Sequence, residues 1–248
     1  HKIKKNFLFI NDLKTTQKVL DKKEKYLNLI ISKSGNTLET IANSNLLINK
    51  NQKNIFITEN KKSYLRTLAN DLKSEVINHN NFIGGRYSVL SEVGMLPAEL
   101  MGLSSKKFRS FNKLIKNNRF INLLITNVSN IYSLHKKKKF NSIILNYDER
   151  STSLFNWYQQ LVAESLGKKS KGILPVISAM PKDNHSLMQF YLDGTKNNFF
   201  TFFRVEEKIS QKINKKYLTN SHSYLSNKST QDVLKAQFEA TQNVFRNK

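Results

Sequence analysis

Short runs of apolar and β-branched residues alternate with amphipathic helical patterns along most of this 248-residue chain. The alternation constrains the fold strongly, because parallel strands have to be joined by crossover connections, usually helices, which then cover the sheet. In the first hundred residues this pattern predicts a βαβαβ unit. Its strands are expected at 7–10, 26–32, 54–58 and 74–78, and its helices at 12–25, 37–49 and 62–73.

A second alternation begins after a helical stretch. Residues 87–135 have helical character, interrupted by Gly94, Pro97 and Gly102. Beyond them we expect strands at 142–147, 174–178 and 199–204, helices at 151–166, 184–193 and 230–245, and a polar loop at 208–228. The whole pattern predicts an α/β fold of two three-layer αβα units with mainly parallel sheets, joined by the helical stretch. We place the two domains at 1–100 and 101–248.

The chain is strongly basic, with a formal net charge of +23. Such a charge is typical of nucleic-acid-binding proteins, whose cations replace the counterions of the phosphates. Here, however, 34 of the 41 basic residues are Lys and only 7 are Arg, and they are spread along the sequence. This bias is what an AT-rich coding sequence produces, and the densest run, 136–139, is predicted to be a solvated loop. A nucleic-acid-binding role is therefore kept only as an alternative.

The sequence has no cysteine, and no apolar run approaches the roughly 20 residues of a membrane-spanning helix. It therefore offers no disulfide framework and no thiolate metal site, which fits a reducing cytoplasm. The chain starts at His1, and its opening residues lack a secretory-signal pattern, so we expect an incomplete amino terminus.

Residues 32–37 (SKSGNT) form a compact polar turn between a predicted strand and a predicted helix. The first amides of a helix lack internal partners and lie at the positive end of its dipole, so a phosphate is stabilised there. Hydroxyls at Ser32, Ser34 and Thr37 add donors, and Gly35 lets the backbone approach a ligand closely. The turn lacks the GxxxxGK[ST] spacing of a nucleotide-binding loop, so a monophosphorylated small molecule is the favoured ligand.

The same turn also has a purely structural explanation. Asn36 and Glu39 have the spacing of a capping box, whose side chains would satisfy the first amides of the helix in place of a ligand. The residues alone leave both explanations open.

Three later segments hold residues suited to acid-base chemistry. After paired glycines, Arg86 presents a permanent cation to developing negative charge. In the helix predicted at 151–166, Gln160 and Glu164 share one face, and a carboxylate so near the carboxyl end is disfavoured by the helix dipole. His185 lies near the start of another predicted helix. Each also has a structural explanation: an arginine in a tight turn, a solvated glutamate and a capping histidine.

Residues 31–40, 83–102 and 154–195 resemble, in chain order, the motifs of the glucose-6-phosphate isomerase (phosphoglucose isomerase) family. The first motif is shared by sugar isomerase (SIS) domains, so the resemblance implies two units of SIS type. It also implies interconversion of glucose 6-phosphate and fructose 6-phosphate through a cis-enediol, with no metal or cofactor. Two family elements have no counterpart: a glycine-rich strand-turn-helix, which would precede His1, and a carboxyl-terminal helix with a catalytic lysine.

The resemblance also implies roles for individual residues. The phosphate ligands would be Ser32, Lys33, Ser34 and Thr37. Glu164 would be the catalytic base, with Gln160 contacting the substrate, and Arg86 would stabilise the enediolate. His185 would assist ring opening in the site of the neighbouring subunit, which implies a homodimer. The alternative within the same fold is a non-catalytic sugar-phosphate-binding protein.

Overall fold

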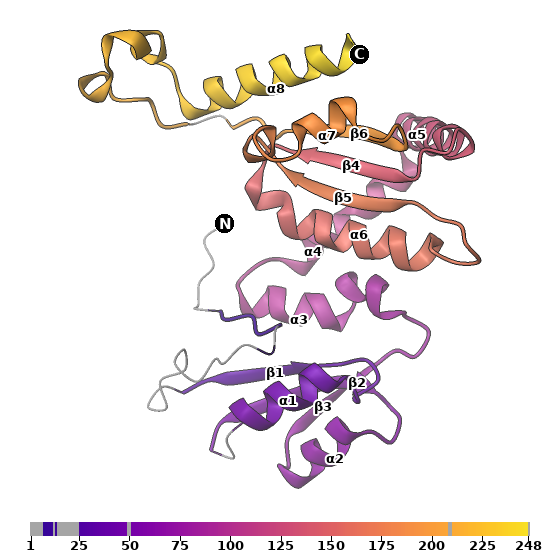
Figure 1. The fold of residues 1–248 in the computed structure, drawn as a ribbon. Helices are drawn as coiled ribbons and strands as arrows, with labels where there is room; N and C mark the ends of the chain where they lie inside the picture. The colour runs from indigo at the N-terminus through magenta and orange to yellow at the C-terminus, as the bar shows by residue number, and fades with distance from the viewer. Residues whose placement is uncertain (1–6, 12, 14–24, 49–50, 208–209, 248) are drawn as a thin grey trace. The chain divides into compact units, whose positions relative to one another are not determined.

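The computed structural model of this chain describes residues 7–11, 13, 25–48, 51–207 and 210–247. The chain divides into two compact units, His1–Ile121 and Asn122–Lys248. Each unit has a three-stranded parallel sheet with helices packed against it, so the predicted α/β fold is confirmed (Figure 1). The units divide inside α5 (Asn118–Lys136), whereas the expected domain boundary follows residue 100.

The strands of unit 1 lie side by side in chain order. They are β1 (Leu27–Ile31), β2 (Lys53–Glu59) and β3 (Glu75–His79), each within one residue of its predicted bounds. Helices α1 (Leu38–Leu47) and α2 (Tyr64–Asp71) make the two crossovers. The central strand β2 is buried over residues 54–59. Because all three strands are parallel, their carboxyl ends lie at the same edge of the sheet.

The stretch expected to be helical, 87–135, is helical in five pieces. They are η2 (Gly85–Leu90), α3 (Glu92–Leu100), α4 (Ser105–Arg109), η3 (Ser110–Lys116) and α5. The strand predicted at 7–10 is wrong: these residues have no regular structure. A run of four apolar residues does not by itself specify a partner strand, so its pattern also fits a loop. The helix expected at 12–25 falls outside the described residues, apart from 13 and 25, which are not helical.

In unit 2 the first strand lies in the middle of the sheet. β4 (Asn141–Asn146) pairs in parallel with both β5 (Leu174–Ala179) and β6 (Asn198–Phe203). Helices α6 (Thr152–Leu166) and α8 (Thr230–Arg246) match their predictions. The helix expected at 184–193 is shorter, and consists of η5 (Lys182–Asn184) followed by α7 (Met188–Asp193). Three more 3-10 turns are η4 (Glu149–Ser151), η6 (Lys215–Tyr217) and η7 (Asn220–Leu225).

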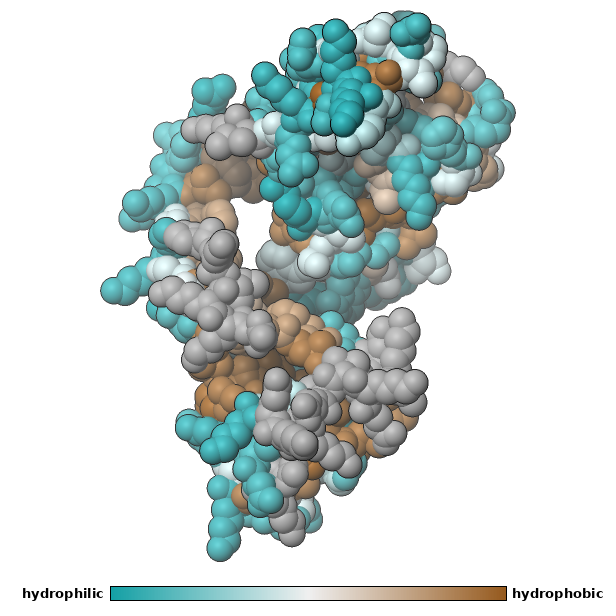
Figure 2. Space-filling view, turned by 90° about the vertical axis from the view of Figure 1, so that its left-hand side faces the viewer, coloured by the Kyte–Doolittle hydropathy of each residue, from teal (hydrophilic) through white to brown (hydrophobic). Residues whose placement is uncertain are grey.

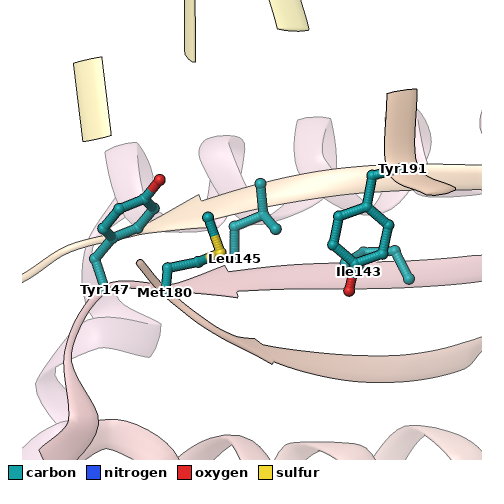
Figure 3. Close-up of a cluster of buried hydrophobic side chains, with 5 residues drawn as sticks. All are labelled: Ile143, Leu145, Tyr147, Met180 and Tyr191. Carbon is teal, nitrogen blue, oxygen red and sulfur yellow. The ribbon is translucent and has the colours of Figure 1, made fainter. Parts of the chain in front are cut away.

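Each unit has its own apolar core. The core of unit 1 consists of Ile30, Phe56, Leu65 and Ala69. The core of unit 2, drawn in Figure 3, consists of Ile143, Leu145, Tyr147, Met180 and Tyr191. Helix α8 packs on this second core with aromatic rings. Phe238, for example, meets the Tyr147 ring edge to face, with 5.1 Å between the ring centroids.

The variant Phe56→Ala should lower the free energy of unfolding of unit 1 by about 3–5 kcal/mol, because its ring is fully buried and its removal leaves a cavity. Phe82→Ala removes the same ring from a side chain that is 98% exposed, and should change stability by less than about 0.5 kcal/mol. Urea unfolding is best followed by hydrogen exchange in β1, β2 and β3, because the chain's single Trp, Trp157, lies in unit 2. Equal losses in the two variants would contradict this core.

Candidate functional site

The turn after β1 brings two predicted phosphate-binding hydroxyls together. Ser32 N donates to Ile57 O at 3.1 Å, which fixes the start of the turn on β2. Ser32 Oγ and Thr37 Oγ1 lie 2.8 Å apart at the amino end of α1. Ser34 is exposed, and its Oγ accepts from Asn36 N at 3.2 Å. The turn therefore collects hydroxyls at a helix amino end, where an anion is stabilised.

The capping-box explanation of this turn is wrong. The N-cap residue of α1 is Thr37, not Asn36, and the side chain of Thr37 makes no cap hydrogen bond. Asn36 contacts the next helix instead, because its Oδ1 accepts from Tyr64 N, in the first turn of α2, at 2.9 Å. The side chain of the N-cap residue therefore does not compete with an anion for the first amides of α1.

Gly35 is required by the packing of the turn. Its φ of +65° lies in the left-handed region, which glycine adopts without strain. A Cβ at this position would lie 2.3 Å from Ser63 Oγ and 2.7 Å from Ser63 Cβ, at the start of α2. Whether Gly35 also lets a ligand approach remains a prediction.

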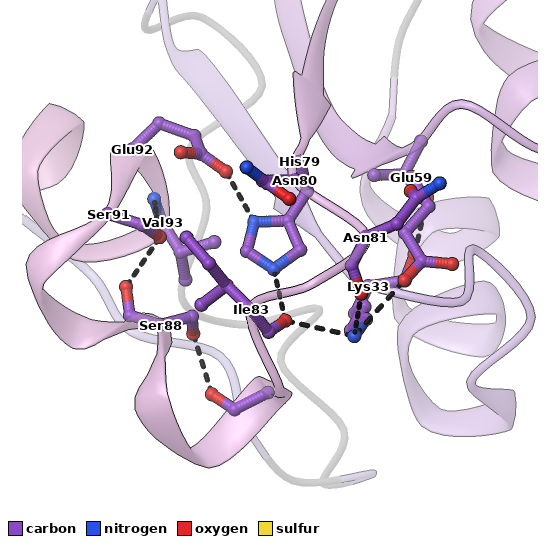
Figure 4. Close-up of polar contacts among 12 residues, drawn as sticks. Lys33, Glu59, His79, Asn80, Asn81, Ile83, Ser88, Ser91, Glu92 and Val93 are labelled. Atoms are coloured by element: carbon purple, nitrogen blue, oxygen red, sulfur yellow. Dashed lines mark hydrogen bonds and ion pairs between the residues drawn. The ribbon is translucent and has the colours of Figure 1, made fainter.

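Lys33 connects this turn to the segment that leads to Arg86 (Figure 4). Its Nζ lies 3.1 Å from Glu59 Oε1, at the end of β2. The same nitrogen donates to Asn81 O at 3.2 Å and to Ile83 O at 2.9 Å, in the loop after β3. The turn and the loop thus meet at the carboxyl edge of the sheet, which is where parallel α/β sheets bind ligands.

Arg86 itself lies in η2 and is half-buried, with its guanidinium carbon 4.8 Å from the centroid of the Tyr87 ring. A Cβ added to Gly85 would meet no atom within 4 Å, so this face of the segment is open. A shallow depression of about 430 Å³ adjoins it, lined by Phe82, Ile83, Gly84, Tyr87, Leu90 and Ser91. Unit 1 therefore carries both a turn rich in hydroxyls and a permanent cation at one edge of its sheet.

Glu59 is buried at the end of β2 and is paired with two lysines. Lys61 Nζ lies 3.0 Å from one carboxylate oxygen, and Lys33 Nζ lies 3.1 Å from the other. Hydrogen bonds from Lys61, the larger effect, and from Lys33 hold the pKa of Glu59 below its usual value.

No sequence motif pointed to Glu59 or His79, which end β2 and β3. A titratable residue that directly ends a buried parallel strand is the signal that would have found them.

Gln160 and Glu164 share one face of α6, as their spacing predicts. Gln160 Nε2 donates to Glu164 Oε2 at 3.4 Å, and both residues are exposed. Tyr158 is half-buried, and burial raises its pKa. Glu164 is therefore accessible to a ligand from the last turn of α6.

His185 is exposed and follows the carboxyl end of β5. Asp183 holds this segment on the strand, because its Oδ2 accepts from Ser178 Oγ at 2.9 Å and from Ala179 N at 2.7 Å. Helix α6 connects β4 to β5 and runs back along the sheet, opposite to the two parallel strands (Figure 1). Glu164, in its last turn, therefore lies toward the amino edge of the sheet. Unit 2 therefore does not bring Glu164 and His185 together.

Within the part of the chain that the structure describes, no three His, Asp or Glu side chains are grouped to hold a metal, and no helix there is long and apolar enough to cross a membrane. Three residues of the lysine run 136–139 are exposed: Lys136 ends α5, and Lys137 and Lys138 lie in the turn that leads to β4, so the predicted solvated loop begins at 137. On the face in Figure 2, hydrophilic residues are spread over both units.

Comparisons of the sequence with known proteins find relatives that match most of this chain. The family model of phosphoglucose isomerase matches residues 7–240. The chain is 33% identical over 236 residues to the glucose-6-phosphate isomerase of Methanocaldococcus jannaschii, which covers 88% of this chain and 56% of the relative. It is 34% identical over 238 residues to the glucose-6-phosphate isomerase of Mycoplasmopsis pulmonis, covering 88% and 55%.

Solved structures agree with these relatives. A hypothetical protein of Thermus thermophilus matches 92% of this chain and 59% of its own, with a TM-score of 0.78 and 26% identity. A glucose-6-phosphate isomerase of Chlamydia trachomatis shares the fold, with a TM-score of 0.53, 20% identity, and coverage of 86% and 44%. Two parallel-sheet units of this kind define a two-domain α/β protein. The chain belongs to the phosphoglucose isomerase family, and it spans somewhat more than half the length of the curated relatives it matches.

The variant Gly35→Ala should weaken binding of inorganic phosphate at least about 10-fold and destabilise unit 1 by about 1–3 kcal/mol, because its Cβ would collide with Ser63 in a strained conformation. Gly85→Ala, where a Cβ meets no atom within 4 Å, should leave stability unchanged. Phosphate titration and urea unfolding measure the two effects. An unchanged phosphate affinity in Gly35→Ala would contradict phosphate binding by this turn.

Acid should destabilise unit 1 in part through Glu59. Because the pKa of Glu59 is lowered in the folded state, its contribution is fully present above about pH 4.3, the ordinary value, and is lost as pH falls through the lower folded value. In the variant Glu59→Gln, the midpoint of urea unfolding should therefore fall less steeply than in the wild type as the pH is lowered from about 5 to about 3. Glu39→Gln, at an exposed carboxylate of the same unit, is the matched control. Parallel curves for wild type and Glu59→Gln would contradict the assignment.

Proposed function

We propose that this chain is the catalytic part of a glucose-6-phosphate isomerase, which interconverts glucose 6-phosphate and fructose 6-phosphate through a cis-enediol. The observation that carries the proposal is the contact of Lys33 with the loop before Arg86. It joins a phosphate-binding turn to a cation at one sheet edge, and an enediolate of a sugar phosphate needs both. The reaction belongs to glycolysis and gluconeogenesis, and a cytoplasmic location agrees with a sequence that lacks cysteine.

The reaction follows from the chemistry of the predicted site residues. Hydroxyls of the turn 32–37 and the amides that begin α1 bind the phosphate. Glu164, with Gln160 beside it contacting the sugar, removes the proton from carbon 2 of the aldose and returns it to carbon 1. Arg86 stabilises the negative charge that develops on the two enediolate oxygens. His185 assists the opening of the sugar ring by proton transfer to and from its oxygens.

The proposed protein is a homodimer in which His185 acts in the site of the neighbouring subunit. Support comes from the topology of unit 2, where Glu164 lies toward the amino edge of the sheet and His185 lies beyond the carboxyl edge. Strand β5 between them has six residues, which is about 20 Å of extended chain. A single sugar cannot readily meet both side chains of the same subunit across that length.

Two other functions have distinct signatures. A non-catalytic sugar-phosphate-binding protein of the SIS class would bind glucose 6-phosphate at the turn 32–37 without converting it. A nucleic-acid-binding protein would bind arbitrary DNA or RNA with an affinity that falls steeply with salt. The spread of the lysines and the small number of arginines disfavour the second function.

The variant Glu164→Gln should lower isomerase turnover by about 10² to 10⁴-fold, the usual contribution of a general base, because the amide cannot accept the proton. Glu149→Gln replaces an exposed glutamate beside the other end of α6 and should keep the wild-type rate. Turnover is measured in both directions with glucose 6-phosphate and fructose 6-phosphate. A retained rate in Glu164→Gln would refute its role as the base.

A further inference from the structure

The carbonyl oxygen of Ile83 accepts two hydrogen bonds from ionisable side chains (Figure 4). Lys33 Nζ donates to it at 2.9 Å, and His79 Nε2 lies 3.0 Å from it. A carbonyl oxygen has two lone pairs, so these two donors saturate it. Lys33 follows β1 and His79 ends β3, so the two donors reach the oxygen from two different strands.

Each donor is itself held by a carboxylate. Lys33 pairs with the buried Glu59 at 3.1 Å. The Nδ1 of His79 contacts the carboxylate of Glu92, the first residue of α3, where the helix dipole favours a negative charge. His79 is only 2% exposed, so its ring is held between these two partners.

The roles of the two ring nitrogens follow from their partners. The oxygen of Ile83 can only accept, so the Nε2 of His79 carries a hydrogen and donates it. The Nδ1 is left for the carboxylate of Glu92, which it contacts. The ring therefore links the carbonyl to the start of α3.

The anchored carbonyl lies three residues before Arg86, with Gly84 and Gly85 between them. Two consecutive glycines can adopt many backbone conformations, so the orientation of η2, which holds Arg86, relative to the sheet depends on what fixes the chain before them. Charge stabilisation demands a position held within about 0.5 Å. We propose that His79 and Lys33 are positioning residues, which hold the Ile83 carbonyl and through it the guanidinium of Arg86 against the enediolate. The proposal rests on the function proposed above for Arg86.

Two substitutions of His79 separate its two contacts. In His79→Gln the amide nitrogen replaces Nε2 and keeps the bond to Ile83, whereas in His79→Asn the amide replaces Nδ1 and keeps only the contact with Glu92. His79→Asn should lower kcat about 10 to 100-fold with KM changed less than about 3-fold, since a displacement near 1 Å can cost about 10²-fold. His79→Gln should stay within about 5-fold of wild type. An equal loss of kcat in both variants would overturn the proposal.

A second pair of variants tests Lys33. Lys33→Met and Lys61→Met each remove one lysine from Glu59, but only Lys33→Met removes a donor from the Ile83 carbonyl. Lys33→Met should lower kcat about 10-fold or more, and Lys61→Met should not. Equal kcat in the two variants would count against a positioning role for Lys33, even if both are less stable than wild type.

Hydrogen exchange keeps this proposal separate from the proposed reaction. Ile83 N donates to Asn80 O and Tyr87 N donates to Gly84 O, so these two amides report order on both sides of the anchored carbonyl. They should exchange at least about 10-fold faster in His79→Asn and Lys33→Met than in His79→Gln and Lys61→Met. Unchanged exchange would overturn the anchor. A wild-type protein without turnover would refute the proposed reaction, and the exchange rates would still decide whether the carbonyl is anchored.

Discussion

Parallel pairing of β1, β2 and β3 is the constraint on which the unit 1 site depends. It brings three strand ends to one edge of the sheet, so residues far apart in the sequence become neighbours there. The turn 32–37 follows the first strand, Glu59 ends the second, and His79 ends the third. Each of these polar groups is close to the others only because the strands point the same way.

The buried carboxylate of Glu59 forms ion pairs with two of the many lysines. A carboxylate taken out of water is costly unless it is paired and hydrogen-bonded, and Lys33 and Lys61 provide both. Most of the other basic residues are spread over the surface, where charge favours solubility and mutual repulsion rather than a defined contact. The net charge of +23 therefore says little about which lysines make defined contacts, whereas the buried Glu59 identifies two of them.

Much of the fold could be predicted from the sequence, because short apolar runs alternate with helical patterns along most of the chain. All six strands of the two sheets and the helix α6 agree with the pattern. The strand expected at 7–10 failed because four apolar residues carry no information about a partner. The helix expected at 184–193 starts later than predicted, because Asp183 is bonded to the end of β5 through Ser178 and Ala179, and hydrophobic periodicity does not reveal such bonds.

In the candidate site, too, local features could be predicted from the sequence and long-range contacts could not. Ser32 and Thr37 were predictable, since they lie in one turn between adjacent elements. The contacts of Lys33 with Asn81 and Ile83 span about fifty positions of the chain, so local patterns could not foresee them. The capping box failed for a similar reason, because the side chain of Asn36 found a partner in another helix.

The packing of Gly35 against Ser63, with Asn36 bonded to the start of α2, has a consequence for affinity. A loop that tightens around its guest loses conformational entropy when it binds, and that loss is subtracted from the interaction energy. The contacts of this turn with Ser63 and Tyr64 already fix its conformation before a ligand binds. The turn is therefore preorganised for an anion. Little conformational entropy would be lost on binding, so nearly all of the interaction energy would contribute to the affinity.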